Sequence, residues 1–169
     1  DYIDIMNRKG LYLKNMLDDF FEYSKLASND IILEKQYLQL NELARQVTEE
    51  DEDEFIRKGL KFSLKLPQES IGIEVDPDLF LRTVNNLLSN ALKYSKNGTT
   101  VELKAGREKY NDSFYSVVSV SNIPKVPIDD EDMENFFERS YKRDLSRKEE
   151  GSGLGLSIVK EIVKLHGGF

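Results

Sequence analysis

Asp76-Pro-Asp-Leu-Phe-Leu-Arg-Thr-Val-Asn-Asn-Leu-Leu-Ser-Asn-Ala-Leu-Lys-Tyr-Ser-Lys-Asn-Gly98 is the stretch that decides the fold of this chain. Asp76 is a good helix cap and Pro77 suits a first helical turn, so the stretch is predicted to form one helix that stops at Asn97-Gly98. At about 100° per residue its apolar residues share one face. These are Phe80, Val84, Leu87, Leu88 and Ala91.

A polar stripe of Arg82, Asn86, Asn90 and Lys93 lies roughly opposite that face. In a helix, Asn is several tenths of a kcal/mol less favourable than Ala, so these amides indicate a role other than stabilising the helix. Asn86 and Asn90 lie one turn apart and Lys93 follows, so two neutral oxygen ligands and a cation point the same way. Magnesium-bound polyphosphate suits that set, because Mg²⁺ prefers oxygen ligands and Lys meets phosphate as a point charge. The alternative is a solvated polar face.

A glycine-rich segment, Gly151-Ser-Gly-Leu-Gly-Leu156, opens directly into a predicted helix whose apolar residues share one face. Glycines let a backbone approach a ligand closely, and a helix start offers free N–H groups and the positive end of a dipole to an anion. The segment therefore indicates phosphate binding, with a flexible glycine hinge as the alternative.

Composition limits the classes of function. The chain has 169 residues, of which 39% are hydrophobic, enough for a core. Its net charge of -7 argues against a nucleic-acid partner, and the absence of Cys excludes disulfides and thiol chemistry. No apolar run approaches the roughly 20 residues that span a bilayer, and no secretory leader is visible. We therefore expect a cytoplasmic segment without direct membrane contact.

The N-terminal segment from Tyr2 to about Ala27 is predicted to be a long helix. One helix cannot bury its own apolar stripe, so partner helices are expected, most simply in a bundle with a second chain. The stripe comprises Tyr2, Met6, Leu13, Met16, Leu17, Phe20 and Ala27.

Between these segments the pattern alternates with period two in several short runs. Two of these runs, 62–67 and 71–75, are expected to form a hairpin, and two later runs to be joined at Asn111-Asp112. Strands grouped with helices favour an α+β sandwich, one sheet with helices on one face. The other expected elements are a strand at 37–40, a helix at 42–59 capped by Asn41, strands at 99–104 and 114–120, and a short helix at 130–138.

Together these segments resemble sensor histidine kinases. Asn86 to Ser95 resembles the N box of their ATP-binding domain, Gly151 to Leu156 the second glycine box, and Phe136 to Tyr141 the aromatic F box. Tyr2 to Ala27, with Asp18-Asp19-Phe20-Phe21-Glu22-Tyr23-Ser24-Lys25-Leu26, is similar to the second helix of their dimerisation and phosphotransfer hairpin.

The resemblance implies a two-layer α/β sandwich of the Bergerat type, with a mixed sheet and helices on one face, preceded by a long bundle-forming helix. Residues 1–35 would be the hairpin helix and connector, and 36–169 the ATP-binding domain, which would be truncated at its C-terminal strands.

The same resemblance assigns site residues. Asn90 would ligate Mg²⁺, Asn86 would support the metal or phosphate, and Lys93 would contact phosphate. The remaining ATP contacts would come from Tyr94, Asn122, Gly151, Gly153, Leu154, Gly155 and Leu156. Fast ATP-hydrolysing relatives carry Glu where Asn86 stands, and a carboxamide cannot act as a general base, so transfer is favoured over hydrolysis.

The resemblance also implies partners: the chain's own dimerisation helices in a homodimer, and a response regulator. The parent would be a phosphoprotein anchored in a bacterial cell membrane. The acceptor histidine would lie on a preceding helix, since His166, the one histidine present, sits at a predicted helix end and is interpreted as structural or solvent-exposed. This fragment alone is therefore not expected to phosphorylate itself.

One departure concerns the first glycine box, normally Asp-x-Gly-x-Gly, where this chain has Ser121-Asn-Ile-Pro-Lys125. Asn122 still offers an acceptor to the adenine amine but no charge, and Pro124 lacks an N–H, so weaker nucleotide binding is predicted. Some vancomycin-resistance-type sensors carry Asn here. A degenerate nucleotide-binding or dimerisation module is one alternative, and a serine-directed anti-sigma kinase, which would not need the N-terminal stripe, is another.

Overall fold

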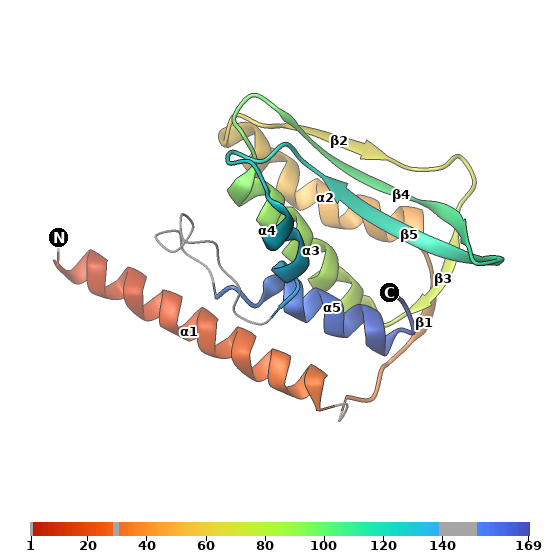
Figure 1. Cartoon of the computed structure of the whole chain (residues 1–169), viewed down its shortest axis with the longest axis horizontal. Coiled ribbons are helices and arrows are strands. Elements are labelled where there is room, and N and C mark those ends of the chain that lie inside the picture. Colours follow the sequence, from red (N-terminus) through yellow and green to blue (C-terminus); the bar gives the residue numbers. More distant parts are fainter. Residues whose placement is uncertain (1, 29–30, 139–151) are drawn as a thin grey trace. The chain divides into compact units, whose positions relative to one another are not determined.

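The computed structural model (Figure 1) describes residues 2–28, 31–138 and 152–169, and the chain divides into two compact units. One unit comprises residues 1–32 and 128–169, and the other residues 33–127. The boundary expected between residues 35 and 36 stays a prediction.

The 33–127 unit holds the strands. A three-stranded mixed sheet has the order β2-β4-β5, with β2 parallel to β4 and β4 antiparallel to β5, while β1 and β3 form a separate antiparallel pair. The predicted α+β class with a mixed sheet is thus confirmed. The elements are β1 (Gln36–Gln39), α2 (Leu40–Arg57), β2 (Lys61–Lys65), β3 (Gly72–Val75), α3 (Pro77–Tyr94), β4 (Thr100–Tyr110) and β5 (Ser113–Ser121).

The predicted hairpin between residues 62–67 and 71–75 is wrong. β2 pairs with β4, and β3 pairs with β1 in the register Gln36↔Val75. The connection at 66–71 is longer than the tight turns that fix a hairpin, and α2 holds both of its ends: Asn41 Nδ2 donates to the Pro67 carbonyl at 3.0 Å and the Leu40 N–H to the Ile71 carbonyl at 2.8 Å. Alternation along a strand reports which face is buried, not which strand is the neighbour.

The helices α2 and α3 both pack on the three-stranded sheet and share its core (Figure 1). Leu88 of α3 is 1% exposed and Val101 of β4 is fully buried, so the predicted apolar face of α3 is the face that meets the sheet. Its opposite face is thereby left for polar side chains. The buried members of this core are Ala44, Val47, Phe55, Leu60, Val84, Leu88, Ala91, Val101 and Leu103.

The predicted cap of α3 is confirmed, because Asp76 Oδ1 accepts from the Leu79 N–H at 3.2 Å and Pro77 opens the helix. The predicted cap of α2 is wrong. That helix begins at Leu40 after Gln39, which makes no side-chain cap, and places Asn41 inside its first turn. The amide is drawn there by the Pro67 carbonyl, so a tertiary hydrogen bond replaces the local one.

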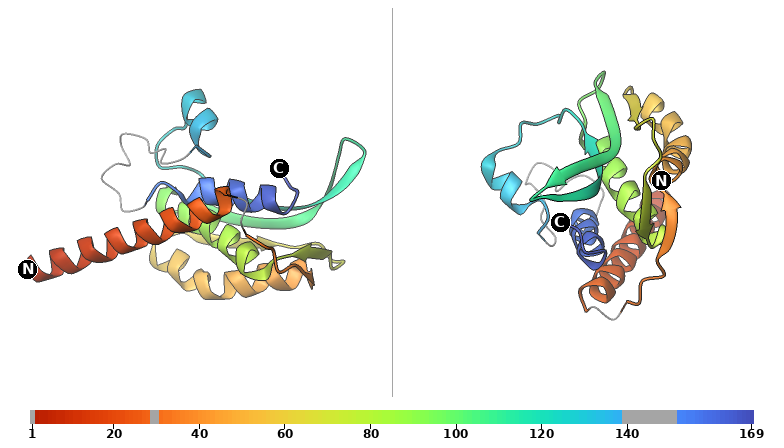
Figure 2. Two further views of the ribbon diagram at one scale, coloured as in Figure 1. Left: turned by 90° about the horizontal axis from the view of Figure 1, so that it is seen from below. Right: turned by 90° about the vertical axis from the view of Figure 1, so that its right-hand side faces the viewer.

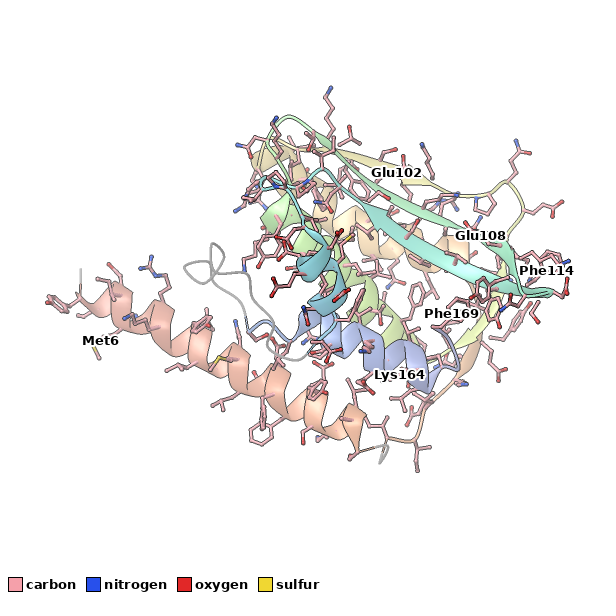
Figure 3. All side chains as sticks on the ribbon, viewed as in Figure 1. Met6, Glu102, Glu108, Phe114, Lys164 and Phe169 are labelled. Atoms are coloured by element: carbon pink, nitrogen blue, oxygen red, sulfur yellow. The ribbon has the colours of Figure 1, made fainter. Side chains whose placement is uncertain are left out.

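The hairpin of β4 and β5 turns at Asn111 and Asp112, as predicted, with φ of 44° and 63°. Two consecutive positive φ values are those of a type I′ turn, whose twist matches the strands it joins. Both strands run further than expected, and Figure 3 shows Phe114 at the hairpin tip, where 70% of it is exposed.

The other unit is helical, with α1 (Tyr2–Ala27), α4 (Asp130–Asn135) and α5 (Gly155–Leu165). The predicted long helix is confirmed, and α1 lies alongside α5 (Figure 2). Leu26 is fully buried, whereas Leu13 and Leu17 of the predicted stripe remain 53% and 52% exposed. Within the described residues, no helix has the length and apolarity to cross a membrane.

Candidate functional site

The stripe on α3 is built as the sequence predicts. Asn86, Asn90, Lys93 and Tyr94 are all partly buried, whereas Asn85, which lies off the stripe, is exposed. Lys93 Nζ lies 5.0 Å from the centroid of the Tyr94 ring, so the cation is held over an aromatic face. The two carboxamides lie one turn apart on the same side of the helix, in the spacing that lets both reach one ligand.

The segment after β5 is attached to the C-terminal end of α3. The Lys96 N–H donates to the Ile123 carbonyl and the Lys125 N–H to the Tyr94 carbonyl, both at 2.8 Å, and Ser95 forms a β-bridge with Pro124. Asn122 is exposed immediately before this attachment. The altered first glycine box therefore lies beside the lysine end of the stripe, as a shared nucleotide site requires.

Lys125 adds a second cation at this end, since its Nζ donates to the Lys93 carbonyl at 2.6 Å. The carbonyls at a helix C-terminus favour a nearby cation, and a lysine held there still presents positive charge to an approaching anion. The sequence prediction missed Lys125. Only its position beside Pro124 pointed to it, because the contact depends on the pairing of two segments distant in the chain.

The oxygen ligands of the α3 stripe limit how Mg²⁺ could bind here. No group of three or more His, Cys, Asp or Glu that could hold a metal occurs in residues 2–28, 31–138 and 152–169. Mg²⁺ is commonly held by one or two protein oxygens together with substrate phosphates and waters, and the carboxamide oxygen of Asn90 is such a ligand. The residues therefore fit a metal that arrives with a polyphosphate, not one held by a protein cage.

The glycine-rich turn belongs to the helical unit. Gly151 lies outside the described residues, while Gly153 has φ of 75°, a conformation that requires glycine. Leu154 is 3% exposed and precedes α5, which starts at Gly155 without a side-chain cap; Leu156 is partly buried in its first turn. A glycine turn that opens into an uncapped helix start is the arrangement that binds phosphate through backbone N–H groups.

Two contacts of this turn were missed by the sequence prediction. Ser152 Oγ donates to Asp19 Oδ2 of α1 at 2.6 Å and accepts from the Leu154 N–H at 3.1 Å. No local pattern links residues so far apart in the chain. In the F box, Glu138 pairs with Lys160 of α5 at 3.0 Å, and residues 139–141 lie outside the described residues.

His166 caps the end of α5, with Nδ1 2.8 Å from the Ile162 carbonyl oxygen, which fits its interpretation as structural.

Comparison with known proteins identifies the family. Residues 75–169 match the model described as histidine kinase-, DNA gyrase B-, and HSP90-like ATPase. The chain belongs to this family. The matched range includes the α3 stripe, the 121–125 segment and the glycine turn.

Its relatives are sensor histidine kinases. The sensor protein VanS of Enterococcus faecium is 32% identical over 99% of this chain and 42% of its own length. The sensor histidine kinase WalK of Bacillus subtilis is 31% identical over 90% of this chain and 25% of its own length. The chain thus spans less than half of either relative.

Solved structures agree on the fold. Full-length ShkA in complex with AMPPNP superposes with a TM-score of 0.76 at 22% identity, covering 98% of this chain and 34% of its own. Histidine kinase ThkA in complex with its response regulator TrrA gives 0.71 at 23% identity, covering 99% of this chain and 44% of its own. At these identities the likeness establishes the fold and leaves ligands and partners to be argued.

Proposed function

We propose that this chain is the catalytic part of a sensor histidine kinase, which binds Mg-ATP and supports transfer of the γ-phosphoryl group to a histidine outside this chain. The observation that best supports this proposal is that Asn86, Asn90 and Lys93 share one side of α3, while the 121–125 segment is attached to the end of that helix. A solvated polar face would not require such an attachment.

Each residue has a role that its chemistry allows. Lys93 and Lys125 place positive charge where the polyphosphate would lie, and Asn86 orients the phosphate or its metal without activating water, because an amide is not a base. Asn90 would hold Mg²⁺, which when bound neutralises charge that develops on the transferring group. The chain's own contribution is positioning and electrostatic stabilisation.

The glycine turn would bind the phosphate tail through the N–H groups of Leu154, Gly155 and Leu156, and Asn122 would accept from the adenine amine. None of these groups can deprotonate a water molecule, so they favour transfer of the phosphoryl group to an external nucleophile over hydrolysis. His166, bonded to its own helix, is not the acceptor.

The partners follow from the same proposal. The exposed apolar residues of α1, among them Leu13 and Leu17, would pair with helices of a second copy, and the phosphoryl group would pass to a response regulator. Relatives named as sensor proteins support a role in signalling. We propose that the segment lies on the cytoplasmic side of a membrane-anchored parent.

The test supplies the acceptor separately. This chain is mixed with Mg-ATP labelled at the γ-phosphate and with the parent protein's helical hairpin that bears the acceptor histidine. We expect acid-labile phosphate on the hairpin, abolished by Asn90→Ala. Asn85→Ala, on the same helix but exposed and off the stripe, is the matched control and should transfer normally.

Nucleotide binding measured in the same samples separates the alternatives. Binding without transfer would favour the degenerate module, and labelling of a serine on a partner would favour the anti-sigma kinase. Equal loss in Asn85→Ala and Asn90→Ala would show that the stripe is not the site.

A further inference from the structure

A chain of two hydrogen bonds connects α1 to the glycine turn. The Asp19 carboxylate accepts from the Ser152 hydroxyl at 2.6 Å, and the same hydroxyl oxygen accepts from the Leu154 N–H at 3.1 Å. Asp19 is partly buried and Leu26, two turns further along α1, is fully buried, so the packing of α1 on α5 holds the carboxylate in place. Asp18, its neighbour, is exposed.

The contact occupies a group that an anion would use. A phosphate at a glycine turn is held by backbone N–H groups of the turn and of the helix that follows, and the N-cap of α5, Leu154, makes no side-chain cap hydrogen bond. The Leu154 N–H, at the entrance to this helix, instead donates to Ser152.

The contact also places a negative charge beside the turn. Only the Ser152 hydroxyl separates the Asp19 carboxylate from the Leu154 N–H. A carboxylate this close repels a polyphosphate, and the repulsion is strongest where water is partly excluded. The occupied N–H and the charge therefore oppose phosphate binding in the same direction.

We propose that Asp19 acts through Ser152 as a restraint on the phosphate-binding turn, so that α1 lowers the affinity of the chain for nucleoside triphosphate. This inference rests on the proposed function and adds regulation of the nucleotide affinity of that site by α1. Because coupling between sites is reciprocal, nucleotide binding loosens the contact between α1 and the turn to the same extent.

The test compares four variants of the full chain by titration with Mg-ATP. Asp19→Ala removes the charge and the anchor and should tighten binding about ten- to a hundredfold, the worth of one hydrogen bond made to a charged group. Asp19→Asn keeps an acceptor for Ser152 and should give a smaller gain. Ser152→Ala frees the Leu154 N–H and should also tighten binding, whereas Asp18→Ala, the matched control, should not change it.

Hydrogen exchange of residues 152–156 without nucleotide provides a second readout. It should quicken in Asp19→Ala and Ser152→Ala but not in Asp18→Ala, and added Mg-ATP should quicken exchange in α1 around Asp19 of the unchanged chain.

The outcomes are distinguishable. Unchanged or weaker binding in both Asp19→Ala and Ser152→Ala, with the unchanged chain binding well, overturns the restraint and leaves the proposed function standing. Failure of every variant to bind Mg-ATP overturns the proposed function and, with it, the control of affinity by Asp19.

Discussion

Replacing Asp76 should uncouple two segments that meet at the start of α3. The side chain is 9% exposed, and its two oxygens serve different partners: Oδ1 caps α3 at the Leu79 N–H, and Oδ2 accepts from the Glu34 N–H at 3.0 Å in the connector before β1. Loss of a cap costs about 1 kcal/mol, and loss of a hydrogen bond to an ionised group about 1.5–3 kcal/mol. Asp76→Ala should therefore lower the free energy of unfolding by roughly 2.5–4 kcal/mol.

Two further variants separate the oxygens. Asp76→Ser retains a cap but cannot reach Glu34, so its loss should be about 1.5–3 kcal/mol. Asp78→Ala, an exposed acidic residue of the same first turn, should cost less than about 1 kcal/mol. Urea unfolding followed by circular dichroism measures all three. A loss in Asp76→Ala no larger than in Asp78→Ala would refute the assignment of two structural bonds to this carboxylate.

Three other expectations are independent of this one. Asn122→Asp restores the charge of the usual adenine contact, so calorimetry should show tighter Mg-ATP binding; equal affinity would contradict the assigned role. Asp112→Gly should raise the free energy of unfolding by about 0.5–1 kcal/mol, because residue 112 has φ of 63° and glycine adopts this conformation without strain. A lower free energy of unfolding in urea would contradict the type I′ turn assigned to Asn111 and Asp112. The hydrogen bond that Lys164 Nζ donates to Glu161 Oε1 raises the pKa of Lys164, whose exposed side chain is labelled in Figure 3. The stabilisation is therefore complete below the ordinary lysine pKa and is lost as pH rises through the folded-state pKa. Glu161→Gln should lower that pKa in an NMR titration.

The sequence predicted best where the determining contacts are local. The periodicity of α1, the Asp76 cap and the Asn111-Asp112 turn each depend on residues within one or two turns of each other, and all three were predicted correctly. The α3 stripe was predicted for the same reason, because helical spacing alone puts its residues on one side.

The failures share a different physical origin. α3 ends at Tyr94, before the Asn97-Gly98 stop, because Ser95 adopts extended backbone and forms a β-bridge with Pro124, and the Lys96 N–H donates to the Ile123 carbonyl. The partner of β3 and the position of Asn41 were likewise decided by distant backbone groups. Hydrogen bonds across the fold compete on equal terms with local ones, and a single sequence does not show them.

The stability of α3 explains why its polar face can hold residues that are poor for a helix. Asn86 and Asn90 cost together about 1 kcal/mol in propensity relative to Ala. Val84 and Leu88 are each 1% exposed on the opposite face, and burial of each contributes about 1.5–3 kcal/mol. The core face and the Asp76 cap therefore outweigh the cost of the amides. Substitutions on that polar face should therefore change nucleotide binding far more than folding.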